Sequence, residues 1–306
     1  MKIRLGYACI PLTIGETSSH MLTLSNYKKL GNNKLDSVIK NNFNSLNNIL
    51  DYNIKNDIIF FRMTSSLIPL LTYPDIDYDF FNQYYDYYKK IGDKILKNKL
   101  RVDMHLSAYC ILNSVNPNVV KSTISVIKSY KKMYDYMNIK SKLVMHVGSA
   151  TNGKREGIKR FIDNFNLLPN ELKELIILEN DDKSYNIRNV LSICEKLNIP
   201  MVLDYHHFKV NKNNEKIEDY IKRIFDTWDG IPKVHFSSPK DKKNKRAHND
   251  YIDVFDFIDF IEKVKFINRD FDIMIEAKKK DCAMFKLIRE LKYRTNYKIE
   301  GTVIYL

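Results

Sequence analysis

The segments Glu174-Leu-Ile-Ile-Leu-Glu-Asn-Asp181 and Pro200-Met-Val-Leu-Asp-Tyr-His-His207 decide the fold. Each is a short apolar run that ends in a residue able to bind a metal ion, Glu179 in the first and Asp204 in the second. Four further runs of the same kind end in His105, His146, His235 and Glu276. In a barrel of parallel strands, the C-terminal ends of all strands meet at one mouth. Six such runs therefore predict a cylinder of parallel strands with a cluster of metal ions at its mouth, which is the organisation of an enzyme.

The whole chain can be divided into eight repeats of a strand followed by a helix. The strand segments are nearly continuous in Val, Ile, Leu and Met, as expected of strands that are covered on both faces. Strict alternation gives a parallel sheet, and eight units close it into a barrel. We therefore predict an α/β fold, a single (β/α)8 TIM barrel in one domain spanning residues 1–306. The expected strands are residues 3–9, 57–63, 101–106, 142–147, 175–180, 201–205, 233–237 and 272–277. The expected helices are residues 35–52, 79–97, 118–138, 154–166, 184–197, 216–228, 253–265 and 282–293. The strand-like end at residues 302–306 has no place in this scheme.

Composition is consistent with one large domain. The chain has 306 residues and 44% hydrophobic content, enough for the core of such a barrel. A transmembrane helix is not expected, because the sequence contains no apolar stretch of about 18 residues or more. The N-terminal segment Met1-Lys-Ile-Arg-Leu-Gly-Tyr-Ala-Cys9 is typical of a strand rather than of a signal peptide. The four cysteines are widely spaced and form no C-x-x-C pair, which favours reduced thiols in a cytoplasmic protein.

The charge of the chain points to an anionic partner. Its net charge is +13 and its pI about 9.3, a balance that favours nucleic acid. Codon bias in an AT-rich genome also produces chains rich in Lys, Asn, Ile and Tyr, so the sum alone does not decide. Placement is more informative: the basic loop Lys240–Arg246 adjoins predicted metal ligands, and Lys154, Arg155 and residues 278–280 belong to the same face. Phosphate binding at the mouth follows from this placement.

The converging acids and imidazoles require compensation. A single His or Glu at a strand end is usually an ordinary hydrogen-bonded polar residue, but here six successive strands carry one. Such groups repel one another unless cations balance them. A shell of His, Asp and Glu without Cys suits Mn²⁺ or Zn²⁺. His248 and Asp250, two residues apart, would face the same way in an extended segment.

Lys233 shares the inward face of its strand with His235, because side chains alternate with period two. An ammonium group beside metal ions would be repelled. Two alternatives remain open from the residues alone: Lys233 pairs with a neighbouring carboxylate, or it is N-carboxylated to a carbamate that itself binds metal.

Eight motifs occur in a fixed order from residue 4 to residue 281. They are Arg4-Leu-Gly-Tyr7, Phe61-Arg-Met-Thr-Ser-Ser66, His146-Val-Gly148, Leu178-Glu-Asn-Asp-Asp182, Asp204-Tyr-His-His207, Lys233-Val-His-Phe-Ser-Ser238, His248-Asn-Asp-Tyr251 and Met274-Ile-Glu-Ala-Lys-Lys-Lys-Asp281. With these motifs the chain resembles the ultraviolet damage endonuclease family, whose wider class includes endonuclease IV-type abasic-site nucleases and sugar isomerases.

The resemblance implies a metal-dependent DNA repair enzyme. It implies ATP-independent incision 5′ to pyrimidine photoproducts, both cyclobutane dimers and 6-4 products, which leaves a 3′-hydroxyl and a 5′-phosphate. Up to three divalent ions are implied, typically Mn²⁺, with Zn²⁺, Mg²⁺ or Co²⁺ as substitutes. By position, one ion would be held by His105, His146 and Glu179, a second by Glu179, Asp204, His235 and Glu276, and a third by His207, His248 and Asp250.

The resemblance also implies roles for single residues. Glu179 and Glu276 are the expected catalytic residues, together with Lys233, which matches the carboxylated lysine of the family. Tyr7 matches an aromatic residue that probes the damaged bases, although the chain has 20 tyrosines and ordinary packing is the alternative. The expected DNA contacts are Tyr7, Tyr109, Lys154, Arg155, Lys240, Lys242, Lys243, Lys245 and Arg246.

The chain departs from the family pattern after the third strand. The family follows its histidine there with Pro-Gly-Gln-Tyr, whereas this chain reads His105-Leu-Ser-Ala-Tyr109. Ala108 thus stands where a glutamine fills the gap left by everted bases. Many members also carry a histidine after the second strand, and this chain has none between His20 and His105.

Three alternatives remain from the sequence. An abasic-site nuclease comes nearest, because loss of the glutamine would shift substrate preference. A sugar isomerase or epimerase would use a similar metal site but needs no basic rim. A catalytically inactive DNA-binding descendant would retain metal weakly. The expected partner is damaged double-stranded DNA, without a membrane or nucleotide cofactor, and the protein is expected to be a monomer in the cytoplasm, on the nucleoid while it acts.

Overall fold

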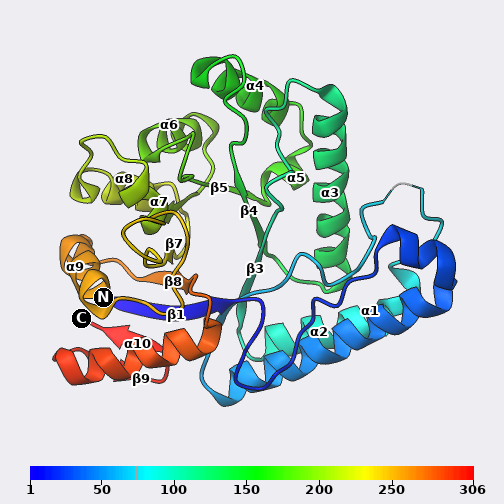
Figure 1. Cartoon of the computed structure of the whole chain (residues 1–306), viewed down its shortest axis with the longest axis horizontal. Helices are drawn as coiled ribbons and strands as arrows, with labels where there is room; N and C mark the ends of the chain where they lie inside the picture. The colour runs from blue at the N-terminus through cyan, green and yellow to red at the C-terminus, as the bar shows by residue number, and fades with distance from the viewer. Residues whose placement is uncertain (74) are drawn as a thin grey trace.

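Eight parallel strands close into a barrel in the computed structural model, which describes residues 1–73 and 75–306 (Figure 1). Each of β2 to β7 pairs with the next strand in the sequence, and β1 closes the ring between β8 and β2. The predicted (β/α)8 barrel is thus confirmed. The strands are β1 (Lys2–Ala8), β2 (Phe60–Arg62), β3 (Arg101–His105), β4 (Lys142–His146), β5 (Ile176–Glu179), β6 (Met201–Asp204), β7 (Lys233–Phe236) and β8 (Phe271–Ile275).

Helices follow the strands and surround the barrel (Figure 1). The predicted helix at residues 216–228 is divided into a 3-10 turn, Ile217–Asp219, and a short helix, Ile221–Asp226. The first helix begins eleven residues earlier than predicted, because the Thr23 side chain caps it and Gly31, at φ 71°, allows it to continue across a kink. Among the described residues, no helix is both long and apolar enough to cross a membrane. The helices are α1 (Leu24–Lys55), α2 (Tyr85–Lys97), α3 (Pro117–Tyr136), α4 (Lys154–Asn166), α5 (Asn170–Lys173), α6 (Ile187–Leu197), α7 (Tyr205–Val210), α8 (Ile221–Asp226), α9 (Val254–Val264) and α10 (Lys280–Arg294), with 3-10 turns at Asn82–Tyr84, Ile217–Asp219 and Lys265–Ile267.

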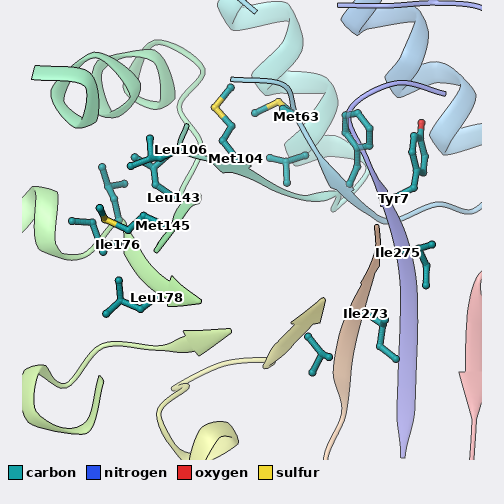
Figure 2. Close-up of a cluster of buried hydrophobic side chains, with 14 of the residues drawn as sticks. Tyr7, Met63, Met104, Leu106, Leu143, Met145, Ile176, Leu178, Ile273 and Ile275 are labelled. Carbon is teal, nitrogen blue, oxygen red and sulfur yellow. The ribbon is translucent and has the colours of Figure 1, made fainter. Parts of the chain in front are cut away.

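Alternation along the strands separates two environments. One set of side chains points outward and packs under the helices; Figure 2 shows part of this cluster, including Leu143 and Met145 of β4 and Ile176 and Leu178 of β5. The other set points into the barrel. Because the run of each strand is apolar on its outward face, the polar residues that interrupt it are directed inward.

The C-terminal hairpin fills a gap in the barrel wall. β1 pairs with β2 only at Tyr7 and Ala8, because β2 is three residues long. Below that point β10 (Val303–Tyr305) pairs antiparallel with residues 2–4 of β1, and β9 (Lys298–Glu300) pairs with β10. Thr302 secures the junction, since its carbonyl accepts from the Leu5 amide at 2.9 Å and its hydroxyl donates to the Asp57 carbonyl at 2.7 Å. The segment that the sequence left unplaced thus seals the base of the barrel.

Candidate metal centre

The inward side chains nearest the mouth form a ring of imidazoles and acids. His105, His146, Glu179, Asp204 and His235 occupy the last or next-to-last positions of β3 to β7. Two groups of three, His105–His146–Glu179 and Glu179–Asp204–His235, each offer ligand atoms within 4.8 Å of one another. Glu276 directly follows β8, and its carboxylate lies 3.3 Å from His235 Nδ1. With Glu276 added to these five residues, all six predicted strand-end ligands lie at the same mouth.

Glu179 lies at the centre of this ring. Its Oε2 is 2.8 Å from His105 Nε2 and 3.8 Å from His146 Nε2, and its Oε1 is 2.9 Å from His235 Nδ1. Burial acts to raise the pKa of this carboxyl, but the neighbouring imidazoles outweigh it and hold the pKa well below its usual range. Glu179 is therefore an ionised carboxylate with both oxygens turned toward nitrogen atoms, the position expected of a bridge between two cations.

Asp204 is the least compensated group in the ring. It caps α7, accepting from the His207 amide at 2.7 Å through Oδ1. Its buried Oδ2 has no hydrogen-bond partner among the described residues, and His207 Nδ1 lies 3.5 Å away. Burial, reinforced by the charges of Glu179 and Glu276, raises the pKa of Asp204 well above its usual value. An orphaned carboxylate oxygen of this kind is costly unless a cation binds it.

Arg62, which the sequence analysis did not single out, holds Glu276 in place. Its guanidinium is buried and donates from Nη1 to Glu276 Oε1 at 2.6 Å, while Nη2 lies 2.6 Å from His235 Nε2. This cation outweighs burial and lowers the pKa of Glu276. Burial lowers the pKa of His235 to about 4, so this imidazole is neutral and keeps a lone pair. A signal existed in the sequence, because Arg62 closes the apolar run of β2 as the other site residues close theirs.

Lys233 lies one inward position below His235 and forms an ion pair with Asp103, a second residue that the sequence analysis missed. Burial lowers the pKa of Lys233 to about 8, whereas Lys233 and Arg62 together outweigh burial and lower the pKa of Asp103. This pairing is the first of the two alternatives for Lys233. The carboxylation of this lysine stays a prediction.

The expected third ligand group is only partly assembled. The rings of His207 and His248 lie 6.4 Å apart, and His248 is oriented by a contact of 2.6 Å between its Nδ1 and the Glu276 carbonyl. His206 is fully buried beside them, with its ring 5.2 Å from that of His248. Asp250 is exposed and belongs to neither ligand group. The Lys279 amide donates to its backbone carbonyl at 3.0 Å.

The mouth opens into a cavity of about 590 Å³ that is lined by Arg62, His105, His248, Glu276, Lys278 and Lys280. The side chain of Tyr109 is 89% exposed in the loop after β3. Lys154 and Arg155 open α4 and are exposed, and the loop after β7 carries Lys240, Lys242, Lys243, Lys245 and Arg246 on its surface. The predicted basic residues therefore surround the same end of the barrel.

Tyr7 does not lie at the mouth in this structure. The alternation of β1 directs it outward with Ile3 and Leu5, where it is fully buried, packs against Phe61 at 5.1 Å and donates to Asn53 Oδ1 at 2.7 Å. The structure thus places Tyr7 as a core residue and leaves Tyr109 as the exposed aromatic side chain of the two.

The donor set fits divalent metal ions. Two buried carboxylates, those of Glu179 and Asp204, and the half-buried carboxylate of Glu276 converge with imidazole nitrogens. One of their oxygens is unpaired among the residues that the structure describes. Oxygen and imidazole ligands without a thiolate suit Mn²⁺, Zn²⁺ and similar ions. The residues present can therefore hold a metal cluster.

Comparison with known proteins identifies the family to which the chain is similar. The model of the UV-endonuclease UvdE family matches residues 3–304. A UV DNA damage endonuclease of Bacillus cereus (strain B4264) is 38% identical over 301 residues, which cover 95% of each chain. The crystal structure of SacUVDE superposes with a TM-score of 0.88 at 32% identity and covers 95% of this chain and 98% of that chain. Endonuclease IV from Thermus thermophilus shares the fold alone, with a TM-score of 0.58 at 10% identity over 95% of this chain and 100% of that chain.

These similarities extend along nearly the whole chain. They confirm the resemblance drawn from the eight motifs and the expectation that the chain is an enzyme, since endonucleases are hydrolases. This chain belongs to the UV-endonuclease UvdE family.

Proposed function

We propose that this chain is a metal-dependent endonuclease that incises DNA 5′ to ultraviolet photoproducts, both cyclobutane dimers and 6-4 products, leaving a 3′-hydroxyl and a 5′-phosphate. The observation that carries the proposal is Glu179, a buried carboxylate with imidazoles on both oxygens, at the mouth of a barrel whose family is that of UV endonucleases. The substrate is damaged double-stranded DNA. The protein would act as a monomer in the cytoplasm.

The residues that would hold metal ions follow from the ring. One ion would be bound by His105, His146 and Glu179, and a second by Glu179, Asp204, His235 and Glu276. A third would be bound by His207 and His248. Asp250 reaches this third group only if its loop rearranges. Mn²⁺ is the ion that we propose, because the set combines carboxylate oxygens with imidazoles. When bound, such ions lower the pKa of a coordinated water and stabilise the charge on the phosphate oxygens.

The side chains around the ring prepare it for a phosphodiester. Arg62 fixes the carboxylate of Glu276, and Lys233 supports the ring from below, paired with Asp103 while no metal is bound. Lys278 and Lys280 line the cavity and would bind the phosphates that flank the cleaved bond. Because the basic rim is large and exposed, it favours a polymeric anion over the small sugar that an epimerase would bind.

Selectivity would come from the cost of everting bases. Crosslinked pyrimidines pair and stack poorly, so they leave the duplex more easily than normal bases do. Tyr109 is exposed in the loop that follows His105 and can stack on the strand or fill the vacated space. Ala108 is also exposed but too small for that purpose, and this position favours the abasic-site nuclease as the second candidate, since an abasic site leaves less base to accommodate.

The test uses a 5′-labelled duplex with one thymine dimer, incubated with Mn²⁺ beside an undamaged and an abasic duplex. We expect a single nick next to the dimer. Glu179→Gln and Glu276→Gln should abolish the nick while DNA binding persists, because each removes a ligand charge but leaves the basic rim intact. Glu195→Gln on the exposed face of α6 is the matched control and should retain activity.

The outcomes separate the candidates. Cleavage of the abasic duplex alone would establish the second candidate. Failure to cleave any of the duplexes would refute the assignment as a nuclease. Activity that survives Glu179→Gln would refute the proposed metal centre.

A further inference from the structure

A second cavity lies beside the mouth, outside the metal centre. This flank groove, of about 420 Å³, is lined by residues from the C-terminal end of α1 and the first turns of α10. Its walls are formed by Thr13, Tyr52, Tyr251, Phe285, Lys286 and Arg289, among others. None of these residues has a role in the metal centre.

The flank groove continues the rim of the mouth. Three residues that line the mouth cavity are followed closely in the sequence by residues that line the groove. Cys9 is followed by Thr13, His248 by Tyr251, and Lys280 by the groove residues of α10. A chain advances at most about 3.5 Å per residue, so the three residues from His248 to Tyr251 span no more than about 10 Å. That distance corresponds to roughly three nucleotides along one DNA strand, at about 3.4 Å each.

The polar groups of the groove are suited to an anion. Arg289 is exposed and makes no ion pair among the described residues, and the nearest carboxylate to Lys286 Nζ is Glu290 Oε1 at 4.0 Å. Lys286 Nζ lies 4.3 Å from the centre of the Tyr251 ring, a cation–π contact that holds both side chains in position. No carboxylate lines the groove in the part of the chain that the structure describes.

The walls of the groove are held rigidly. Asp281 is fully buried behind it and accepts from the Tyr52 hydroxyl at 2.8 Å and from the Leu12 amide at 2.7 Å. One carboxylate thereby ties α10 to α1 and to the loop after β1. A site of this kind needs little reordering when a ligand binds, which lowers the entropic cost of binding.

We propose that the flank groove binds the phosphate backbone of the DNA duplex on one side of the lesion, with Lys286 and Arg289 as the phosphate-binding side chains. This inference rests on the proposed function, because it assigns a subsite to the same substrate. Two cations, hydroxyl donors at Thr13 and Tyr251, and continuity with the mouth all favour a phosphate chain over a neutral ligand.

The first measurement is the salt dependence of binding to a labelled undamaged duplex, which is not cut, by fluorescence anisotropy on the Mn²⁺-loaded full chain. Each lost phosphate contact lowers the slope of log K against log salt by about 0.9. Lys286→Ala combined with Arg289→Ala should therefore give a slope shallower by about 1 to 2 and roughly tenfold weaker binding near 0.1 M salt. Arg289→Ala alone, at an exposed position, serves as the variant least able to disturb folding.

The control pair is Lys97→Ala with Lys196→Ala, which removes the same charge from the last turns of α2 and α6, at the opposite end of the barrel. It should change the slope by much less than the groove pair. Equal slopes for the two pairs would overturn the proposal, because they would show an effect of net charge alone.

The second measurement shortens the lesion duplex stepwise on either side and follows KM for incision. Truncation on one side should raise KM for the wild-type protein but not for the groove pair, whose kcat should stay unchanged. Equal responses of both proteins to truncation on both sides would overturn the proposal. If the wild-type protein cuts no duplex, the proposed function fails, and the salt-dependence comparison still decides whether the groove binds DNA.

Discussion

Arg62 offers the most direct test of how the site is held together. Arg62 is 6% exposed, and its Nη1 lies 2.6 Å from Glu276 Oε1, with Asp103 Oδ1 at 3.6 Å from its Nε. Arg62→Met preserves much of the volume but leaves the buried carboxylate of Asp103 and the half-buried carboxylate of Glu276 without this cation. Removing one partner of a buried ion pair typically costs about 3–5 kcal/mol in the free energy of unfolding.

The expected change in melting temperature follows from chain length. For 306 residues the unfolding entropy is about 0.64 kcal/mol/K, from about 2.1 cal/mol/K per residue, so each kcal/mol lowers Tm by roughly 1.5 °C. Arg62→Met should therefore lower the Tm of the metal-free protein by about 5–8 °C. In Mn²⁺ the loss should be smaller, because bound cations would supply part of the missing positive charge to Glu276.

The matched control is Arg223→Met. Arg223 also makes two hydrogen bonds to a glutamate, Glu195, at 2.9 and 2.8 Å, but both side chains are largely exposed. An exposed pair contributes about 1 kcal/mol or less, so Tm should fall by less than about 2 °C. Differential scanning calorimetry with and without Mn²⁺ decides the matter: equal losses for the two variants, or a loss in Arg62→Met that Mn²⁺ does not reduce, would refute the reasoning.

Three further outcomes are expected. Tyr109→Ala should weaken binding or incision of a dimer duplex by about 1–3 kcal/mol, with no change in Tm. Tyr7→Phe should instead lower the free energy of unfolding by about 1 kcal/mol, because its hydrogen bond to Asn53 is lost, and should leave DNA affinity unchanged. Fluorescence anisotropy measures the DNA affinity of each variant, and calorimetry measures its stability. Native mass spectrometry should find Lys233 unmodified in metal-free protein. After loading with Mn²⁺ and bicarbonate it should find one added CO₂ beside the bound metal, since a carbamate beside Asp103 is tolerable only with cations bound. A loaded sample that gains the mass of the metal alone would contradict this. Protein kept at a free Mn²⁺ concentration of 100 times the Kd should lose about 2.7 kcal/mol of unfolding free energy when the metal is removed, or about 4 °C in Tm. The chain should remain folded at room temperature.

The strands and their terminal ligands could be predicted because both follow from local pattern. An apolar run that ends in Glu179 or Asp204 needs no knowledge of its neighbours, and barrel closure brings such ends together. The same alternation that exposes the ligands also fixes Tyr7. Arg4, Gly6 and Ala8 share the inward face of β1, so Tyr7 points outward. The alternation of side chains along β1 therefore indicated a core position for Tyr7, whereas the family resemblance implied a DNA contact.

Arg62 and Asp103 could not be assigned in the same way. Their partnership depends on register, because β2 and β3 pair with Arg62 opposite Asp103, and on the closed ring, because Lys233 of β7 reaches Asp103 of β3 across the barrel interior. The C-terminal hairpin depended on an even less local feature. Gly301, at φ 55°, marks its turn, but its site exists only because β2 is too short to cover the lower half of β1.

Two groups of ion pairs lie inside the barrel beneath the acids of the mouth. At the base, Asp272 pairs with Arg4 and Arg101, and above it Asp103 pairs with Lys233 and lies near Arg62. Four cationic side chains against two carboxylates leave two net positive charges beneath the three acids of the mouth. Arg62 keeps Glu276 ionised before any metal arrives, and the imidazoles do the same for Glu179, as the lowered pKa values of both groups require. The barrel therefore carries most of the compensation for its own acids, and this is why metal removal is expected to lower stability modestly instead of unfolding the chain.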